Sequence, residues 1–103
     1  MKTYLIFDGI YYKIGRSTNI EKRFKNIKSN NPNVILLAYT NCDIEKELHN
    51  KYNQYLYYSE WFLIKDENII TELLNEYDIH IDSTHIQDNI STKERMSIGS
   101  KNS

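Results

Sequence analysis

Residues 2–15 contain two apolar runs, largely of β-branched and aromatic residues, on either side of Asp8, a pattern typical of a β-hairpin whose side chains alternate between two faces. In the run KTYLIFDGIYYKIG, β-branched and aromatic residues stand on both sides of Asp8-Gly9, a strong signal for a two-residue turn. A turn at this point would pair Tyr4 with Lys13 across the hairpin. The alternation predicts two faces. One face carries Leu5, Phe7, Ile10, Tyr12 and Ile14, and the other carries Tyr4, Ile6, Tyr11 and Lys13, with Gly15 just beyond it.

The next segment, 17–29 (STNIEKRFKNIKS), has the apolar spacing of an amphipathic helix. Thr18, followed three residues later by Glu21, predicts a capping box at its start. Arg23 lies inside the apolar stripe, where an aliphatic residue would be expected. The stripe itself consists of Ile20, Phe24 and Ile27.

Two further segments, 41–55 and 66–77, also have helical spacing. The first is predicted to begin at Asn41 or Asp43 and the second to be capped by Asp66. The apolar run 34–39 predicts a third strand, and 60–64 (EWFLI) predicts a short fourth strand or an extended segment. The predicted fold is therefore α/β, with a small antiparallel three-stranded sheet, and this short fourth strand, flanked by three helices.

This pattern predicts a single domain over residues 1–79 and a flexible tail over 80–103, where polar residues dominate with weak periodicity. A single cysteine, Cys42, excludes an intrachain disulfide and a cysteine-built zinc site, and it indicates a reducing compartment. No apolar run is long enough to span a membrane, and the N-terminal residues lack the pattern of a signal peptide. We therefore expect no membrane association and a cytoplasmic location.

The net charge of −1 conceals an asymmetry along the chain. Residues 1–65 contain ten Lys and Arg against six Asp and Glu, whereas residues 66–103 contain three against eight. Within the first part, a basic cluster faces only one acid, Glu21. Such a cluster suits a polyanionic partner, although an ordinary solvated helix face has the same composition. Its members are Lys13, Arg16, Lys22, Arg23, Lys25 and Lys28.

The run YKIGRSTNIEKRFKNI, followed by IEKELH and EWF, resembles the GIY-YIG nuclease superfamily over residues 2–64. The small branch of phages and large DNA viruses is the most similar. The resemblance implies an endonuclease that hydrolyses DNA phosphodiester bonds with Mg²⁺ or Mn²⁺. For a viral chain, the location would be the host cell or the virion.

The literal word GIY at 9–11 cannot supply the first motif, because Tyr11 would lie on the same strand as Lys13. The resemblance instead places KTY (2–4) in the first motif and KIG (13–15) in the second. Tyr4 would then help to activate the attacking water. Lys13 would stand where a second tyrosine is usual, as a catalytic group that either accepts a proton or lowers the pKa of Tyr4. Gly15 would allow close backbone approach at the strand end.

The resemblance also implies roles for residues on the two following helices. Arg23 would hold the scissile phosphate, and Glu45 would hold the metal. His49, four residues after Glu45, would either support this site from behind or face the phosphate. The histidine that many relatives have at the end of the first helix is missing. The residues expected to bind the nucleic acid are Arg16, Lys22, Lys25 and Lys28.

Each of these residues, taken alone, has a structural explanation as a strand tyrosine or a solvated charge. Their joint placement favours function, and two functional classes follow. The first is a divalent-metal-dependent endonuclease. The second is a catalytically weak or inactive nucleic-acid-binding module of the same fold. Because so little chain lies outside the catalytic region, target choice would come from DNA shape, self-association or a separate DNA-targeting partner.

Overall fold

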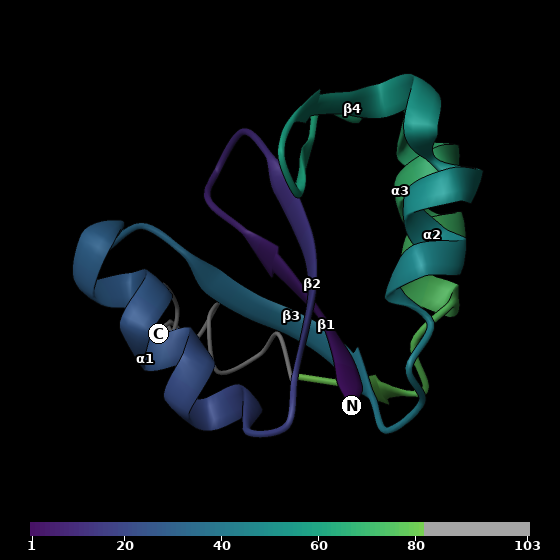
Figure 1. The fold of residues 1–103 in the computed structure, drawn as a ribbon. Coiled ribbons are helices and arrows are strands. Elements are labelled where there is room, and N and C mark those ends of the chain that lie inside the picture. Colours follow the sequence, from purple (N-terminus) through teal and green to yellow (C-terminus); the bar gives the residue numbers. More distant parts are fainter. Residues whose placement is uncertain (82–103) are drawn as a thin grey trace, which may run out of the picture.

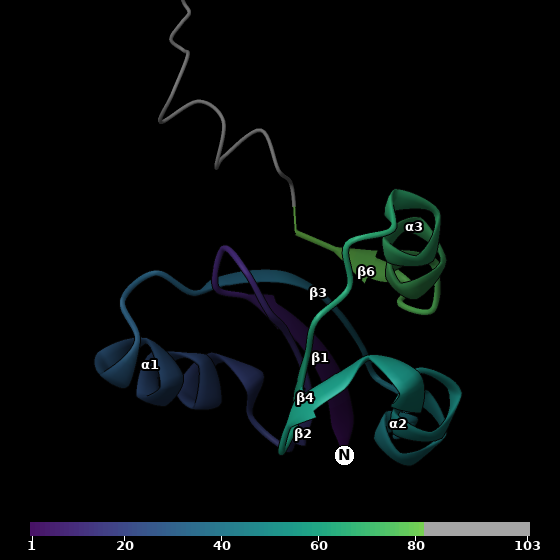
Figure 2. The same ribbon diagram turned by 90° about the horizontal axis from the view of Figure 1, so that it is seen from above.

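The structure, a computed structural model, describes residues 1–81 and is built around one antiparallel sheet. Helix α1 (Ile20–Asn30) covers one face, and helices α2 (Glu45–Lys51) and α3 (Glu67–Asn75) cover the other (Figures 1 and 2). The strands lie in the order β4-β5-β2-β1-β3-β6. Their bounds are β1 Lys2–Phe7, β2 Tyr12–Ser17, β3 Ile35–Thr40, β4 Leu56–Tyr58, β5 Trp61–Phe62 and β6 Ile79–His80.

The predicted fold class is confirmed, with three helices flanking an antiparallel sheet, but the sheet has six strands. The additional strands β4 and β6 have three and two residues, too few for a periodic pattern to be visible in the sequence. The predicted helix 41–55 is also shorter than expected. It comprises α2 and a separate 3₁₀ turn, η1 (Asn53–Tyr55), which leads into β4. The predicted domain end at residue 79 falls within β6, and residues 82–103 of the predicted tail lie outside the described residues.

The hairpin register differs from the prediction by two residues. Tyr4 lies opposite Gly15 rather than Lys13, and Lys13 lies opposite Ile6. The reason is Asp8, whose Oδ1 accepts hydrogen bonds from the backbone N–H groups of Ile10 and Tyr11 at 2.8 and 2.7 Å. These bonds widen the turn into a four-residue loop. Because a shift of two preserves the alternation of side chains, the predicted division between the two faces survives for the strand residues. It is wrong for Ile10 and Tyr11, which lie in the loop, and Ile10 is 61% exposed.

Two predicted helix starts are wrong in detail. The N-cap of α1 is Asn19, whose side chain accepts from Lys22 N, so Thr18 does not form the predicted capping box. Helix α2 has no side-chain cap of its own, from Asn41, Asp43 or any neighbour. Instead, the buried Thr3 hydroxyl on β1 accepts from Ile44 N and donates to Cys42 O, both at 2.9 Å. The cap of α3 by Asp66 is confirmed.

Each face of the sheet has its own apolar core. Beneath α2 and α3 lies a cluster that includes Leu5, Ile14, Leu48, Phe62 and Leu73. Beneath α1 lies a smaller cluster with Tyr4, Ile6, Ile20 and Val34, against which Phe24, Ile27 and Trp61 pack. Burial on both faces explains why β1 is apolar at nearly every position, and why period-two alternation alone could not identify a single core side. Within residues 1–81, none of the helices has the length and apolar character needed to cross a membrane.

Candidate functional site

The second half of β2 forms an open edge where groups from both faces of the sheet can meet. Strand β5 pairs with β2 only at Tyr12 and Lys13, with one further backbone hydrogen bond from Ile14 N to Glu60 O at 3.1 Å. Gly15 follows directly and has no side chain to separate the two faces. Of the predicted site residues, Lys13, Gly15 and Arg16 lie on β2 itself. Glu45 and His49 contact this strand from α2.

Tyr4 and Gly15 are opposite each other on β1 and β2, and the Tyr4 ring lies over the glycine. A Cβ at Gly15 would come within 2.9 Å of Tyr4 Cε1 and would overlap the hydroxyl oxygen. The prediction for Gly15 is a close backbone approach, whereas the group that the structure places beside it is the Tyr4 side chain. Gly15 keeps the phenol hydroxyl at the open edge.

The Tyr4 hydroxyl lies within electrostatic reach of three charged side chains from three different elements. Burial raises the pKa of Tyr4 to about 12, with Glu60 and Glu45 adding to the rise and Arg23 opposing it. Tyr4 is only 2% exposed, so its phenol is a buried neutral group beside these charges at neutral pH. Arg23 and Glu45, which influence this hydroxyl, are also the residues to which the resemblance assigns the phosphate and the metal.

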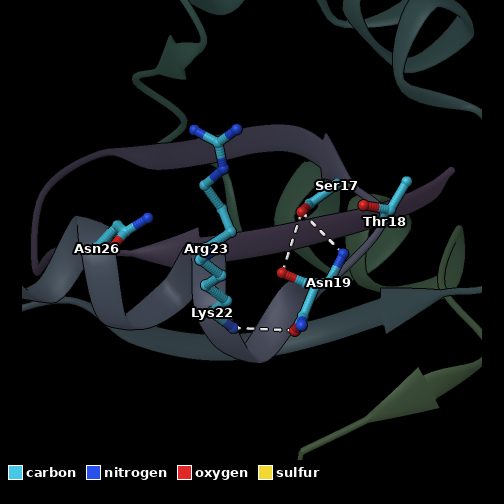
Figure 3. Close-up of a pocket in the computed structure, with 6 residues that line it drawn as sticks. All are labelled: Ser17, Thr18, Asn19, Lys22, Arg23 and Asn26. Carbon is cyan, nitrogen blue, oxygen red and sulfur yellow. Dashed lines mark hydrogen bonds between the residues drawn. The ribbon is translucent and has the colours of Figure 1, made fainter.

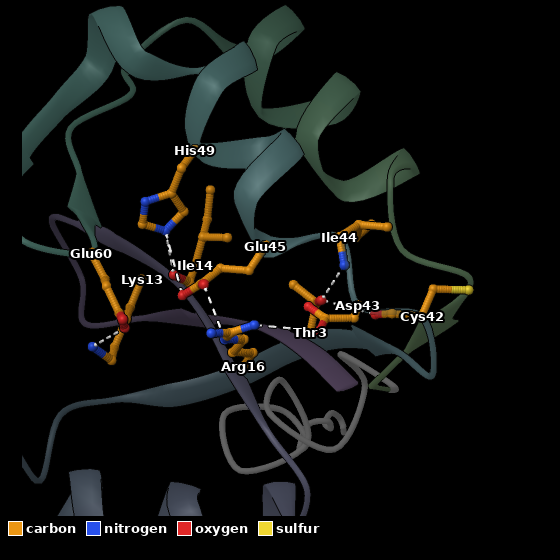
Figure 4. A network of polar contacts seen from close by, with 10 residues as sticks. All are labelled: Thr3, Lys13, Ile14, Arg16, Cys42, Asp43, Ile44, Glu45, His49 and Glu60. Atoms are coloured by element: carbon orange, nitrogen blue, oxygen red, sulfur yellow. Dashed lines mark hydrogen bonds and ion pairs between the residues drawn. The ribbon is translucent and has the colours of Figure 1, made fainter. Parts of the chain in front are cut away.

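Glu45 is the first residue of α2 and lies beside β2 (Figure 4). Its side chain is 16% exposed, and its Oε1 is 3.5 Å from Arg16 Nε. Partial burial and the neighbouring Glu60 carboxylate raise the pKa of Glu45, while His49 and Arg16 lower it. Two carboxylates from separate elements thus influence each other, and their repulsion is offset in part by Arg16 beside Glu45 and Lys13 beside Glu60.

Glu60 is the residue of this site that the sequence analysis did not identify. It lies in the turn between β4 and β5, and its Oε1 accepts from Lys13 Nζ at 2.9 Å. The Lys13 side chain is 15% exposed and that of Glu60 is 38% exposed, so the pair opens toward solvent on the Glu60 side. Glu60 is the acid of the EWF motif and could be seen in the sequence. Its proximity to β2, however, follows only from the pairing of Trp61 with Lys13.

His49 anchors α2 to the site strand. Its Nε2 is 2.8 Å from Ile14 O, and because a carbonyl only accepts, Nε2 carries the hydrogen. The same nitrogen is 3.8 Å from Glu45 Oε2, and the ring meets Phe62 edge-on with centroids 5.0 Å apart. His49 therefore fixes the position of Glu45 relative to β2.

Helix α1 contributes an open hollow at its first turns (Figure 3). The hollow has a volume of about 530 Å³, and every residue that lines it has a polar or charged side chain. Arg23 extends from α1 as an exposed side chain, although the sequence places it within the apolar stripe. The lining residues are Ser17, Thr18, Asn19, Lys22, Arg23 and Asn26.

The four residues predicted to bind nucleic acid have different surroundings. Lys22 and Lys25 are exposed on α1. Arg16 is exposed but makes ion pairs with Asp43 at 3.4 Å and with Glu45. Lys28 turns back to the loop after α1, where its Nζ donates to Pro32 O at 3.3 Å and Val34 O at 3.4 Å. Lys22 and Lys25 are therefore the two whose charges are directed to solvent.

Among residues 1–81, no group of three or more His, Cys, Asp and Glu side chains is arranged to hold a metal ion. Glu45, with Glu60 beside it, offers hard oxygen donors at an open edge. Mg²⁺ and Mn²⁺ accept such donors together with water and phosphate oxygens, so they need no closed cage of protein ligands. The donor set therefore fits a divalent cation of this type.

Comparisons with known proteins give one match. Residues 2–78 match the family model described as the T5orf172 domain. Neither the curated proteins nor the solved structures that were compared contain a match to this chain. The matched range covers every element from β1 to α3, including all the residues of the site described above.

Proposed function

Because this chain belongs to the T5orf172 domain family, a nuclease-like family, we propose that it is a divalent-metal-dependent endonuclease of the GIY-YIG type that cuts DNA. The observation that carries the proposal is the set of contacts beside β2, where Lys13 pairs with Glu60 at 2.9 Å and Arg16 Nε lies 3.5 Å from Glu45 Oε1. Arg23, Glu45 and Glu60 also influence the pKa of the buried Tyr4 hydroxyl. These groups match what phosphodiester hydrolysis requires, namely a cation for the phosphate, a carboxylate for a metal and a group that handles the proton of water.

Arg23 binds the scissile phosphate. Its guanidinium is exposed and close enough to Tyr4 to lower that residue's pKa, so a phosphate held by Arg23 would lie beside the phenol. A guanidinium donates two parallel hydrogen bonds to phosphate oxygens and stabilises the charge that grows on them.

Lys13 and Glu60 form an ion pair, and we assign the two residues different roles in the reaction. An ammonium has only donors, so Lys13 would orient Glu60 and attract the phosphate rather than accept a proton. The half-exposed Glu60 carboxylate is the better acceptor for the proton of an attacking water. Tyr4, protonated at neutral pH, would donate its hydrogen bond to that water or to the phosphate.

Glu45 would hold Mg²⁺ or Mn²⁺, which would neutralise charge on the phosphate and acidify a bound water. His49 and the Thr3 contact to Ile44 keep Glu45 at the β2 edge without taking part in the chemistry. Arg16, 3.5 Å from the same carboxylate, would move onto the DNA backbone when the cation binds.

The test is conversion of supercoiled plasmid to nicked or linear DNA in buffer with Mg²⁺ or Mn²⁺. The parent protein should cut, and Glu45→Ala should not. Glu47→Ala is the matched control, because Glu47 is an exposed acid on the same helix. Glu60→Gln should lower the cutting rate by roughly a hundredfold or more, the usual scale for loss of a general base.

The second candidate is a nucleic-acid-binding module without cutting activity. The ion pair between Arg16 and Glu45 favours it, because this contact satisfies the carboxylate without a metal. A protein that binds DNA but leaves plasmid intact in both metals would establish this alternative, and equal cutting by the parent and Glu45→Ala would overturn the assignment of Glu45.

A further inference from the structure

A second hollow is lined in part by Trp61, and aromatic side chains form most of its wall. Its volume is about 270 Å³, and its lining comes from the β1–β2 loop, the loop after α1, and strands β4 and β5. We call it the aromatic groove. The lining residues are Asp8, Tyr11, Asn31, Tyr57, Tyr58 and Trp61.

The aromatic groove holds large rings in contact with water. Tyr57 is 64% exposed and Tyr58 is 72% exposed, although strand β4 has only three residues to hold them. The rings of Tyr11 and Tyr57 stack with centroids 4.6 Å apart and an interplanar angle of 25°. Clustered exposed aromatic rings mark a surface that binds something with an apolar face.

The wide loop of the hairpin creates this arrangement. In the two-residue turn expected from the sequence, Tyr11 would be a strand residue opposite Ile6. In the observed four-residue loop, Asp8 Oδ1 holds the Tyr11 backbone at 2.7 Å, and the Tyr11 ring reaches Tyr57. The stack is therefore built from two segments that are far apart in the sequence.

The aromatic groove adjoins the candidate active site through Trp61. Lys13 and Trp61 are paired on β2 and β5, and Lys13 Nζ lies 5.2 Å from the centroid of the Trp61 ring. Glu60, which binds Lys13, directly precedes Trp61 in the chain. A DNA strand that placed a phosphate at Lys13 could therefore place a neighbouring base against the aromatic rings of the groove.

We propose that the aromatic groove binds unpaired nucleobases of the DNA strand that the active site holds. The inference rests on the proposed function for the identity of the ligand as DNA. Every base has an aromatic face that stacks on tyrosine or tryptophan irrespective of sequence. Charge supports bases as the occupant, because the carboxylate of Asp8 in the lining repels phosphate and no lysine or arginine among residues 1–81 lines the groove.

The occupant must come from DNA with unpaired bases. In an intact duplex the bases are stacked inside and cannot reach a surface ring without being flipped out, which costs free energy. Single strands, flaps, mismatches and gaps present bases without this cost. The groove therefore directs the protein toward DNA that contains an unpaired region next to the scissile phosphate.

The chain has one tryptophan, Trp61, so intrinsic fluorescence reports on the groove directly. We would titrate the full chain, without divalent metal, with a single-stranded thymidine oligonucleotide and with an abasic oligonucleotide that has the same number of phosphates. The thymidine strand should quench Trp61 emission and bind at least tenfold more tightly than the abasic strand. Equal binding of both strands would show that phosphates alone are recognised and would overturn the proposal.

Substitutions of Tyr57 separate stacking from general apolar contact. Because Tyr57 is exposed, its replacement should leave the fold intact. Tyr57→Ala should weaken binding of the thymidine strand about fivefold or more, Tyr57→Phe should restore it, and Tyr57→Leu should not. Ile10→Ala is the control, since Ile10 is 61% exposed nearby but does not line the groove. Parent-like binding by Tyr57→Leu would overturn the proposal.

Two further results separate this inference from the proposed function. If the parent nicks plasmid but Tyr57→Ala loses no affinity for single strands, the groove proposal fails and the nuclease proposal stands. If the parent binds single strands through Tyr57 but cuts no DNA, the nuclease proposal fails and the groove proposal stands. If size-exclusion chromatography shows a dimer that Tyr57→Ala dissociates, the groove is an interface between copies of the chain, and the proposal fails.

Discussion

The Tyr4 side chain occupies the space that any side chain at Gly15 would need, on the strand directly opposite. This relationship explains the glycine of the KIG motif by close packing rather than by an unusual backbone angle. It also keeps the phenol at the edge of β2, where Arg23, Glu45 and Glu60 influence it. A small residue on one strand thus positions a reactive group on the next.

Gly15→Ala should therefore damage the site even though it adds a single methyl group. The Tyr4 ring is 2% exposed and has little room to move, so overpacking should destabilise the fold by about 1–3 kcal/mol. The free energy of unfolding in urea measures this. Tyr4→Leu has a shorter side chain, so the double variant should lose less than the sum of the two single losses. Strict additivity would mean that the two residues do not compete for space.

Arg23→Ala should reduce plasmid cutting by roughly a hundredfold or more, because it removes a positioned donor to the phosphate. The melting temperature should change little, since Arg23 is exposed on α1. Lys22→Ala is the matched control, because it removes a charge from the adjacent position of the same helix. A similar loss of activity in both variants would indicate that general charge matters and that Arg23 has no specific role.

Divalent metal should bind at Glu45 even without DNA. Burial and the neighbouring Glu60 carboxylate raise the pKa of Glu45, and a divalent cation beside the two carboxylates would relieve this repulsion in competition with Arg16. Titration with Mn²⁺, followed by the loss of its free paramagnetic signal, should show a weak site that Glu45→Gln abolishes and Glu47→Gln retains. Removal of metal with a chelator should stop cutting reversibly. Unchanged Mn²⁺ binding by Glu45→Gln would place the metal elsewhere.

The buried phenol of Tyr4 should make stability depend on pH in the alkaline range. Its pKa is raised from 10.0 to about 12, so the stability that the neutral form contributes is fully present below pH 10 and is lost as pH rises through 12. The urea midpoint should therefore fall across this range, and it should fall less steeply in Tyr4→Phe, which cannot ionise. Tyr52 and Tyr77, whose pKa values are also raised, remain in both proteins and cancel in the comparison. Identical slopes would contradict the burial of the Tyr4 hydroxyl.

DNA affinity should depend on the exposed lysines of α1. The double substitution of Lys22 and Lys25 by alanine should weaken binding to DNA of any sequence. The slope of the logarithm of the binding constant against the logarithm of salt concentration should fall by the amount expected for the loss of about one to two phosphate contacts. Lys65→Ala is the control, since this exposed lysine lies between β5 and α3 and not on α1. Lys28 is a poor choice, because its bonds to Pro32 O and Val34 O make a stability loss part of any effect. Salt-independent binding of the parent would exclude α1 as the DNA-binding surface.

The sequence alone determined the elements whose signals are local and long enough. The two strands of the hairpin, the three helices and the cap at Asp66 follow from periodicity and turn chemistry within a few residues of each other. The division of Tyr4 and Leu5 between opposite faces also follows, because alternation survives a register shift of two. The predicted positions of Tyr4, Arg23 and Glu45 came from the resemblance to a known family.

Only the tertiary structure decided the features that depend on contacts between distant segments. Asp8 could have formed a two-residue turn, and its side-chain bonds to Ile10 and Tyr11 set the wider loop and hence the register. Glu60 looked like an ordinary exposed acid until the pairing of β5 with β2 brought it to Lys13. Such pairings involve residues separated by more than forty positions, and no local pattern records which distant strand a two-residue segment will join.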